Sequence, residues 1–344
     1  MRTAPDRPSL SEIAQRARRA YVGSITGGAS APPWWTAVIV TASSNRQAER
    51  YEAEIERRRG AGTIPPGVLF LVVPDLDDVR IGSGGATLNA IRALAAEVLC
   101  ASGAGSLEDW WRTQRVLLIH SGGDSRRLPE YSLAGKLFSA LPIKTPWGDV
   151  STVFDETLAL STDWAGKLAD GLVVASGDVI LTFDAGQLDW SRPGVSGVAM
   201  RQPIEIGSQH GVYVVGDEGR VYSFLQKPSA AEVRAAGGML AEDTVALDIG
   251  LIRFDVSVAA RLTELAGVSR LSEMSALALT STEESSKLFP DCGSGVSLLT
   301  DAVLLMVVVC PELTVTTTIA DTCSPSTIVS RLQVTVPVVS LQFP

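Results

Sequence analysis

Apolar and polar positions along the chain follow two patterns that change near residue 194. Before that point, short apolar runs alternate with longer amphipathic stretches, which predicts buried parallel strands connected by helices. The predicted strands are residues 37–41, 68–73, 115–119 and 172–176. The predicted helices are residues 9–21, 45–59, 88–99 and 153–168, the first opened by a Ser9/Glu12 capping box. The first pattern indicates an α/β fold with a Rossmann-like, mostly parallel sheet.

From Gly194 onward the runs are shorter and alternate with polar residues, which is typical of antiparallel strands. Residues 195–201 and 246–254 are predicted strands, and residues 211–215 and 220–225 flank a Gly-Asp-Glu-Gly turn as a hairpin. The tail after about residue 291 is rich in Val, Thr, Ser and Leu and nearly bare of charge. Its runs 303–309 and 332–341 could be strands or an exposed aggregation hazard. We expect this tail to be a divergent or out-of-frame end that replaces the rest of a longer protein.

These patterns predict three parts: an N-terminal helix and loop over residues 1–34, a main domain over 35–290, and a β-prone tail over 291–344. The 344 residues carry a net charge of −9, which argues against nucleic acid or an anionic membrane as the main partner. The four cysteines lack paired metal spacing, and His120 and His210 do not complete a zinc set. With no signal-peptide core near the start and no apolar run of eighteen residues, we expect a cytoplasmic protein with reduced thiols.

The strand at residues 115–119 leads directly into a glycine-rich, basic loop. The sequence there reads Ile119-His120-Ser121-Gly122-Gly123-Asp124-Ser125-Arg126-Arg127-Leu128-Pro129, with Gly135-Lys136 shortly after. Glycine N–H groups can turn toward an anion, and a serine hydroxyl, forked guanidiniums and a lysine suit phosphate oxygens. This composition predicts a polyphosphate site at the carboxyl end of the strand, where α/β sheets bind ligands. A tight turn with basic surface residues is the alternative, and the Walker A pattern is absent because Leu137 follows Lys136.

A second glycine-rich turn, Gly82-Ser83-Gly84-Gly85, precedes the helix predicted at 88–99. Free N–H groups at a helix N-terminus attract anions, although glycines there also allow close packing of strand and helix. Ser43, Ser44 and Asn45 follow the first strand and could either touch the ligand or cap the next helix.

Two aspartates are candidate ligands of a divalent cation. Asp178 follows the strand at 172–176 and would hold a metal near the phosphates, with Asp184 in reserve and helix capping as the alternative for either. Asp248 interrupts an apolar run, and a buried carboxylate without a partner would cost several kcal/mol. A metal or a cationic partner explains Asp248 most economically.

The loop around Gly122-Gly123, together with Ile81-Gly82-Ser83-Gly84-Gly85-Ala86-Thr87-Leu88-Asn89 upstream, resembles the sugar-1-phosphate nucleotidyltransferases. Within that group it is similar to the fucose-1-phosphate guanylyltransferase (GDP-fucose pyrophosphorylase) domain of the fucokinase family, over roughly residues 35–290. Asp124 departs from the glycine usual in the wider superfamily. The resemblance implies a GT-A-like nucleotidyltransferase fold, and it implies that the enzyme makes GDP-fucose and pyrophosphate from GTP and fucose 1-phosphate with Mg²⁺.

The same resemblance assigns roles by position. Arg126 and Lys136 would contact the triphosphate, Lys227 the sugar phosphate, and Asp178 and Asp248 the magnesium ion. Gly82, Gly84, Gly85, Gly122, Gly123 and Ser125 would bind the nucleotide. By itself, Lys227 at a strand end could simply be solvated. Two alternatives stay open: a noncatalytic binding or regulatory domain derived from a fucokinase, and a related enzyme that uses another sugar phosphate or nucleotide.

Overall fold

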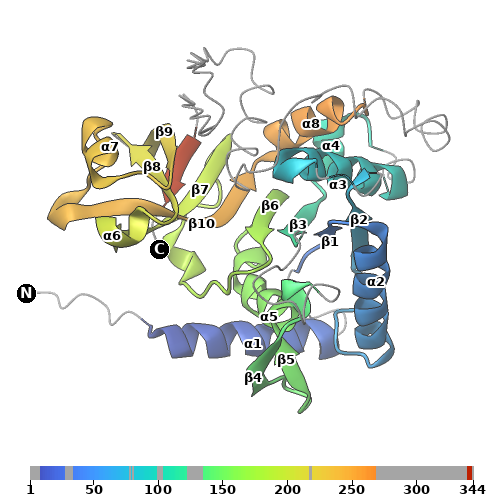
Figure 1. Ribbon diagram of the computed structural model, residues 1–344. Helices are drawn as coiled ribbons and strands as arrows, with labels where there is room; N and C mark the ends of the chain where they lie inside the picture. The colour runs from blue at the N-terminus through green and yellow to red at the C-terminus, as the bar shows by residue number, and fades with distance from the viewer. Residues whose placement is uncertain are drawn as a thin grey trace, which may run out of the picture.

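The computed structural model describes residues 8–27, 34–76, 79, 81–98, 104–121, 135–216, 219–268 and 339–342. Within these ranges, one sheet has nine strands in the order β2-β1-β3-β6-β10-β7-β11-β9-β8, and β4 and β5 form a separate hairpin (Figure 1). The strands are β1 (Ala37–Ala42), β2 (Leu69–Pro74), β3 (Arg115–His120), β4 (Ala140–Lys144), β5 (Val150–Thr152), β6 (Gly171–Ser176), β7 (Val195–Pro203), β8 (Gly211–Val215), β9 (Arg220–Gln226), β10 (Thr244–Phe254) and β11 (Val339–Gln342).

The helices of the described ranges follow the strands in a regular alternation through the first half of the chain. None of them combines the length and apolarity needed to span a bilayer. The α-helices are α1 (Leu10–Thr26), α2 (Asn45–Gly60), α3 (Gly82–Val98), α4 (Leu107–Trp111), α5 (Val153–Ala165), α6 (Ile204–Gly207), α7 (Ala230–Ala235) and α8 (Val256–Leu265). Short 3₁₀ turns are η4 (Lys136–Phe138), η5 (Ala185–Gln187) and η7 (Ala241–Asp243).

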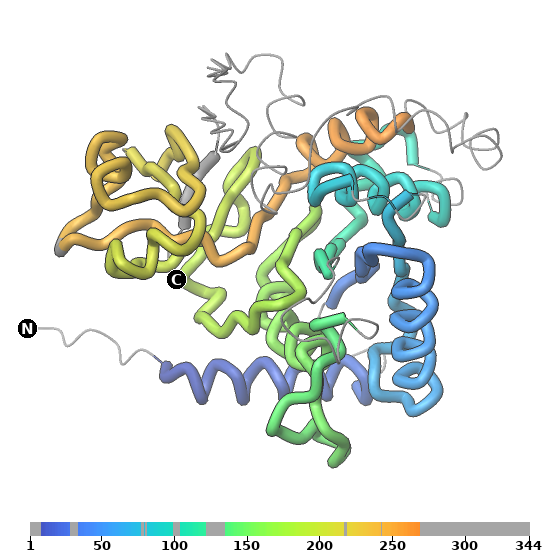
Figure 2. The backbone as a smooth tube through the Cα atoms, in the orientation of Figure 1, coloured from blue at the N-terminus to red at the C-terminus, as the bar shows by residue number. Residues whose placement is uncertain are grey.

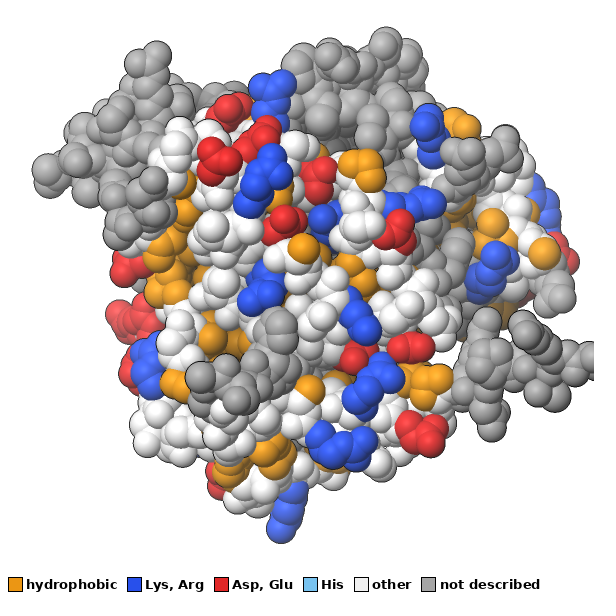
Figure 3. Space-filling view, turned by 180° about the vertical axis from the view of Figure 1, so that it is seen from behind, with side chains coloured by type: hydrophobic (Ala, Val, Ile, Leu, Met, Phe, Trp, Pro, Cys, Tyr) orange, Lys and Arg blue, Asp and Glu red, His pale blue; other side chains and the backbone are white. Residues whose placement is uncertain are grey.

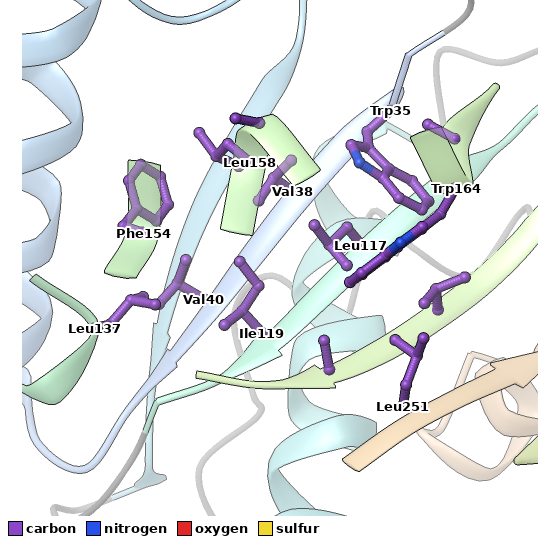
Figure 4. Packing of buried hydrophobic residues seen from close by; sticks show 14 of the residues in the cluster. Trp35, Val38, Val40, Leu117, Ile119, Leu137, Phe154, Leu158, Trp164 and Leu251 are labelled. Carbon is purple, nitrogen blue, oxygen red and sulfur yellow. The ribbon is translucent and has the colours of Figure 1, made fainter. Parts of the chain in front are cut away.

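The four strands β2, β1, β3 and β6 are parallel, and helices cover both faces of this part of the sheet. Side chains of a strand alternate between the two faces. Accordingly Val38 and Val40 of β1 pack with α1, α2 and α5, whereas Ala37 and Ile39 pack with α3, α4 and α8. Figure 4 shows the first of these clusters, where Leu117 and Ile119 of β3 lie beside Val40, Trp35 and Trp164. Burial on both faces explains why these strands are continuous apolar runs.

The second half of the sheet is mainly antiparallel and lies to one side of the layered half (Figures 1 and 2). The long strand β10 joins the two halves, because it pairs antiparallel with β6, β7 and β8. A β-bulge between Asp248 and Leu251, with Gly250 at φ 73°, interrupts its register with β7. Bulges commonly redirect side chains next to active sites.

Helix α1 packs along α5 on one face of the molecule. Its predicted capping box is confirmed: Ser9 accepts from the Glu12 N–H, and the Glu12 carboxylate accepts from the Ser9 N–H. Arg16 pairs with Asp163 of α5 at 2.9 Å, and Tyr21 is buried in the same hydrophobic cluster as Phe154 of α5. Figure 3 shows Lys and Arg side chains interspersed with Asp and Glu side chains on the back of the molecule, rather than gathered into one basic surface.

The structure confirms the predicted α/β organisation and the mixed character of the sheet, and it corrects some element boundaries. Helix α3 begins at Gly82 rather than at residue 88, so the glycine-rich turn is the first turn of the helix itself. The β4–β5 hairpin and the short helix α4 were not predicted. From the tail, Val339–Gln342 forms β11 between β7 and β9, and the predicted strand 303–309 lies outside the described residues.

Candidate active site

The candidate site lies at the carboxyl ends of the four parallel strands. Ala42, Pro74, His120 and Ser176 end these strands at one rim of the sheet, because β1 pairs in register with β2 and β3, and β3 with β6. Polar and glycine-rich segments follow each strand end. Parallel sheets bind ligands at this edge.

The glycine-rich loop predicted to hold phosphates leaves β3 at Ser121 and returns at Gly135, and both ends lie against Tyr51 of α2. The Tyr51 hydroxyl is 2.9 Å from the Ser121 Oγ. Gly135 has φ 65°, and a Cβ built on it would lie 1.8 Å from the Tyr51 oxygen. The two ends of the loop are therefore held together at the rim. Its predicted site residues Gly122, Gly123, Ser125 and Arg126 lie outside the described residues.

Lys136 and Asp178, two of the predicted site residues, meet at this rim. The Lys136 Nζ lies 3.0 Å from the Asp178 Oδ2, and both side chains are about half exposed. Ser176 donates a hydrogen bond of 2.8 Å to the other carboxylate oxygen. Burial alone would raise the pKa of Asp178, but the hydrogen bonds from Ser176 and Lys136 outweigh it and lower the pKa below its ordinary value. Asp178 is thus an ionised, partly accessible carboxylate.

Asp248 lies at the bulge of β10, partly buried and close to the same rim. Its Oδ1 accepts hydrogen bonds from the Tyr213 hydroxyl at 3.1 Å and from the Gly250 N–H at 2.9 Å. Burial raises the pKa of Asp248 to about 7, although these two hydrogen bonds oppose the increase. A carboxylate in this state gains from a nearby cation.

Contacts between strands connect Asp178, Asp248 and Lys227 along the rim. Leu251 pairs with Ala175 as the last β10–β6 pair before the bulge, so the bulged segment that begins at Asp248 lies beside the end of β6. A Cβ built on Gly250 would lie 3.0 Å from the Cβ of Ser176, which confirms that the bulge rests on the end of β6.

Lys227 lies at the end of the β8–β9 hairpin, whose strand β8 pairs with β10. It follows the end of β9, and its N–H donates to the carbonyl of His210 at 2.8 Å. Gly211, the residue after His210, packs against Asp248: a Cβ built on Gly211 would lie 3.4 Å from the Asp248 Cβ. Lys227 is exposed and adopts φ 47°, a left-handed conformation that a lysine rarely takes. Strained residues of this kind concentrate at functional sites.

The second glycine-rich segment forms the N-terminus of α3. Gly82, Ser83, Gly84 and Gly85 are the first four residues of the helix, so their N–H groups lack partners within it. A Cβ on Gly85 would lie 3.0 Å from the Ile81 Cβ, so close packing also requires this glycine. Both readings of the segment, anion binding and close packing, are compatible with this geometry.

The structure gives two of the candidates a structural role. Asp184, the reserve metal ligand, pairs with Arg16 of α1 at 3.0 Å and caps η5. Ser44 caps α2 by accepting a hydrogen bond from the Gln47 N–H. The sequence alone does not single out Tyr51 or Tyr213, because a tyrosine within a helix or strand pattern is typical of the core. Only their long-range contacts with Ser121 and Asp248 relate them to the site.

The residues present fit a magnesium ion bound largely by substrate. Within the described ranges, no group of three or more His, Cys, Asp or Glu side chains could hold a metal. Asp178 and Asp248 offer carboxylate oxygens, and Mg²⁺ commonly takes one or two carboxylates together with phosphates and water.

Comparisons with known proteins point to one family. The sequence model of the fucose pyrophosphorylase domain matches residues 108–292. A bifunctional fucokinase/GDP-fucose pyrophosphorylase of Arabidopsis thaliana is 34% identical over 245 residues, which cover 64% of this chain and 23% of that protein. A fucose-1-phosphate guanylyltransferase of Mus musculus is 30% identical over 234 residues (64% and 38%), and one of Homo sapiens is 29% identical over 270 residues (73% and 42%). The chain thus spans less than half the length of these curated relatives.

Proposed function

Because the chain belongs to the fucose pyrophosphorylase family, we propose that it is a nucleotidyltransferase that joins fucose 1-phosphate and GTP to give GDP-fucose and pyrophosphate. We place the reaction in residues 35–290, with a fold of the GT-A-like nucleotidyltransferase type. The observation that carries the proposal is the Lys136–Asp178 ion pair of 3.0 Å at the strand-end rim, between the ends of the glycine-rich loop and the bulge that bears Asp248.

In this reaction an oxygen of the sugar phosphate attacks the α-phosphorus of GTP, and pyrophosphate leaves in line. The protein needs no covalent intermediate, so its contribution is to position two polyanions and stabilise the charge that develops between them. We assign Lys136 and Arg126 to the triphosphate and Lys227 to the phosphate of the sugar. The backbone N–H groups of the two glycine-rich segments complete the triphosphate site.

Asp178 and Asp248 would hold Mg²⁺, which supplies positive charge between the approaching phosphates. The Lys136 Nζ donates to the Asp178 carboxylate at 3.0 Å, and this contact keeps the lysine beside the proposed phosphate site. When the triphosphate binds, Lys136 exchanges Asp178 for phosphate oxygens. The exchange costs little, because an exposed ion pair contributes only about 0–1 kcal/mol.

The alternative function is nucleotide binding without turnover, in which the same cationic and glycine-rich groups hold GTP but no transfer follows. Such a domain could bind GTP as a regulatory module. The presence of both carboxylates and both lysines in the described residues favours the enzyme.

The test is pyrophosphate release from GTP, ATP and UTP, each with a panel of sugar 1-phosphates, with and without Mg²⁺. We expect magnesium-dependent release that is fastest with GTP and fucose 1-phosphate. Asp178→Asn should lower kcat/KM by about 100-fold or more, by analogy with the loss of one preorganised electrostatic contact. Glu52→Gln, an exposed carboxylate of α2, is the matched control and should leave the rate unchanged. GTP binding without pyrophosphate release would support the module, and wild-type activity in Asp178→Asn would remove this residue from the mechanism.

A further inference from the structure

His120 ends β3 as a buried imidazole between two threonines from other elements. Its side chain is 7% exposed. The Nε2 lies 2.9 Å from the Oγ1 of Thr87 in α3, and the Nδ1 lies 3.4 Å from the Oγ1 of Thr41 in β1. A leucine would fill such a core position without any polar group to satisfy. The histidine therefore calls for an explanation beyond packing.

The directions of the hydrogen bonds follow from the partners at each end. The single hydroxyl hydrogen of Thr87 is donated to the Ser83 carbonyl at 2.8 Å, so toward His120 this oxygen can only accept. Nε2 must then carry the proton, which leaves Nδ1 as an acceptor. Thr41 accepts from the Ser121 N–H at 3.2 Å and can donate its own hydrogen to Nδ1. In the neutral ring, every group in this chain of hydrogen bonds has one role.

This relay runs from the Ser121 N–H through Thr41, His120 and Thr87 to the Ser83 carbonyl. Ser121 is the first residue after β3 and begins the glycine-rich loop, whereas Ser83 lies in the glycine-rich first turn of α3. The His120 carbonyl also accepts from the Gly177 N–H at 2.8 Å, directly before Asp178. The side chain of His120 thus links the end of β1 and the first turn of α3, and its backbone carbonyl contacts the segment that bears Asp178.

We propose that His120 is a positioning residue, whose neutral Nε2–H imidazole fixes the first turn of α3 relative to the carboxyl ends of β1 and β3, at the rim where the triphosphate is proposed to bind. This inference rests on the proposed function. Burial lowers the pKa of His120 to about 4, in agreement with a neutral ring.

The test compares Thr87→Val, His120→Leu and His120→Gln with Thr263→Val. Thr87→Val keeps the shape of the side chain and removes the hydrogen bond between residue 87 and the Nε2 of His120, one arm of the relay. Thr263→Val is the matched control, because Thr263 is another buried threonine with two hydrogen bonds, to Trp111 and Ala259, on α8 away from the rim. His120→Gln places an amide N–H near the Nε2 position and keeps the arm to Thr87, whereas His120→Leu removes both arms.

We expect Thr87→Val to raise KM for GTP by about tenfold, the equivalent of one buried hydrogen bond, with a smaller change in kcat and a melting temperature no lower than that of Thr263→Val. His120→Gln should recover most of the activity that His120→Leu loses. Nitrogen NMR of the ring should show the Nε2–H tautomer. Amide hydrogen exchange at Ser121 should accelerate in Thr87→Val, although the substitution lies on a different element.

Kinetics of Thr87→Val and His120→Leu that match those of Thr263→Val would overturn the positioning role, and an Nδ1–H tautomer would overturn the relay. If the wild-type protein neither turns over nor binds GTP, the proposed function fails instead. The relay itself is then judged by the tautomer and by exchange at Ser121: an unchanged exchange rate in Thr87→Val rejects it.

Discussion

Asp248→Asn should make the ligand-free protein more stable while it removes activity. The carboxyl of Asp248 has a pKa of about 7 in the folded protein against an ordinary value of 3.8. Asparagine has the same shape and keeps an oxygen that can accept from the Tyr213 hydroxyl and the Gly250 N–H. It never ionises, so the cost of burying a carboxylate disappears. A residue that lowers stability in this way is typical of a functional site.

The size of the effect depends on pH. The folded-state pKa is raised, so the unfolded chain gives up its proton first, and stability falls as pH rises from about 4 to about 7. For these two pKa values, the ionisation of Asp248 costs about 2 kcal/mol at pH 5 and about 4 kcal/mol at pH 8. Asp248→Asn should therefore stabilise the protein by about 2 kcal/mol more at pH 8 than at pH 5.

Urea unfolding of both proteins at pH 5 and pH 8, without Mg²⁺, measures this difference, and Glu52→Gln serves as the control. Magnesium with GTP should raise the stability of the wild type, which binds it, but not that of Asp248→Asn. A stabilisation that is equal at both pH values, or a loss of stability at pH 8, would refute the reasoning that Asp248 is a buried carboxylate in need of a cation.

Two further predictions follow from the rim. Gly135→Ala should lower stability and activity more than Gly62→Ala does, because both glycines have φ 65° but only a Cβ at residue 135 would collide with Tyr51. Thermal unfolding and pyrophosphate release compare the two variants, and equal losses would contradict the close packing at Gly135. His120→Gln should make the free energy of unfolding less dependent on pH in acid: burial lowers the pKa of His120 from 6.5 to about 4, so the wild type loses about 3 kcal/mol of stability as pH falls through this range. If the free energy of unfolding of His120→Gln falls between pH 7 and 4.5 as steeply as that of the wild type, the buried neutral imidazole is contradicted.

Elements with strong local patterns were predicted correctly from the sequence. The apolar runs became β1, β2, β3 and β6, and the turn-flanked pair became the hairpin of β8 and β9. The family resemblance, read from the two glycine-rich segments, is confirmed by the match over residues 108–292. Local patterns suffice for these features because the strands are buried on both faces and the motif is contiguous.

Other features depend on contacts that no local pattern records. The start of α3 was missed because glycines disfavour a helix, yet Gly84 is buried and Gly85 packs against Ile81. Strand β4 was missed because its residues are largely exposed and include Pro142. The approach of Lys136 to Asp178 joins residues 42 positions apart, so it follows from the parallel order of β3 and β6 rather than from the sequence around either residue.

The site assignments and the division into residues 1–34, 35–290 and 291–344 stay predictions. They share one requirement, which is that the described carboxylates and lysines act on one nucleotide. Nucleotidyl transfer differs from a kinase reaction in the phosphorus atom of GTP that is transferred: the α-phosphorus in the first and the γ-phosphorus in the second.

The most direct measurement is the fate of the phosphorus label when the protein is given fucose 1-phosphate, Mg²⁺ and GTP labelled with ³²P at either the α or the γ position. We predict that the α label appears in the sugar nucleotide and the γ label in pyrophosphate, and that Asp178→Asn slows both transfers by about 100-fold or more. A γ label in the sugar product or in free phosphate, or no transfer of the α label by the wild type, would contradict the account.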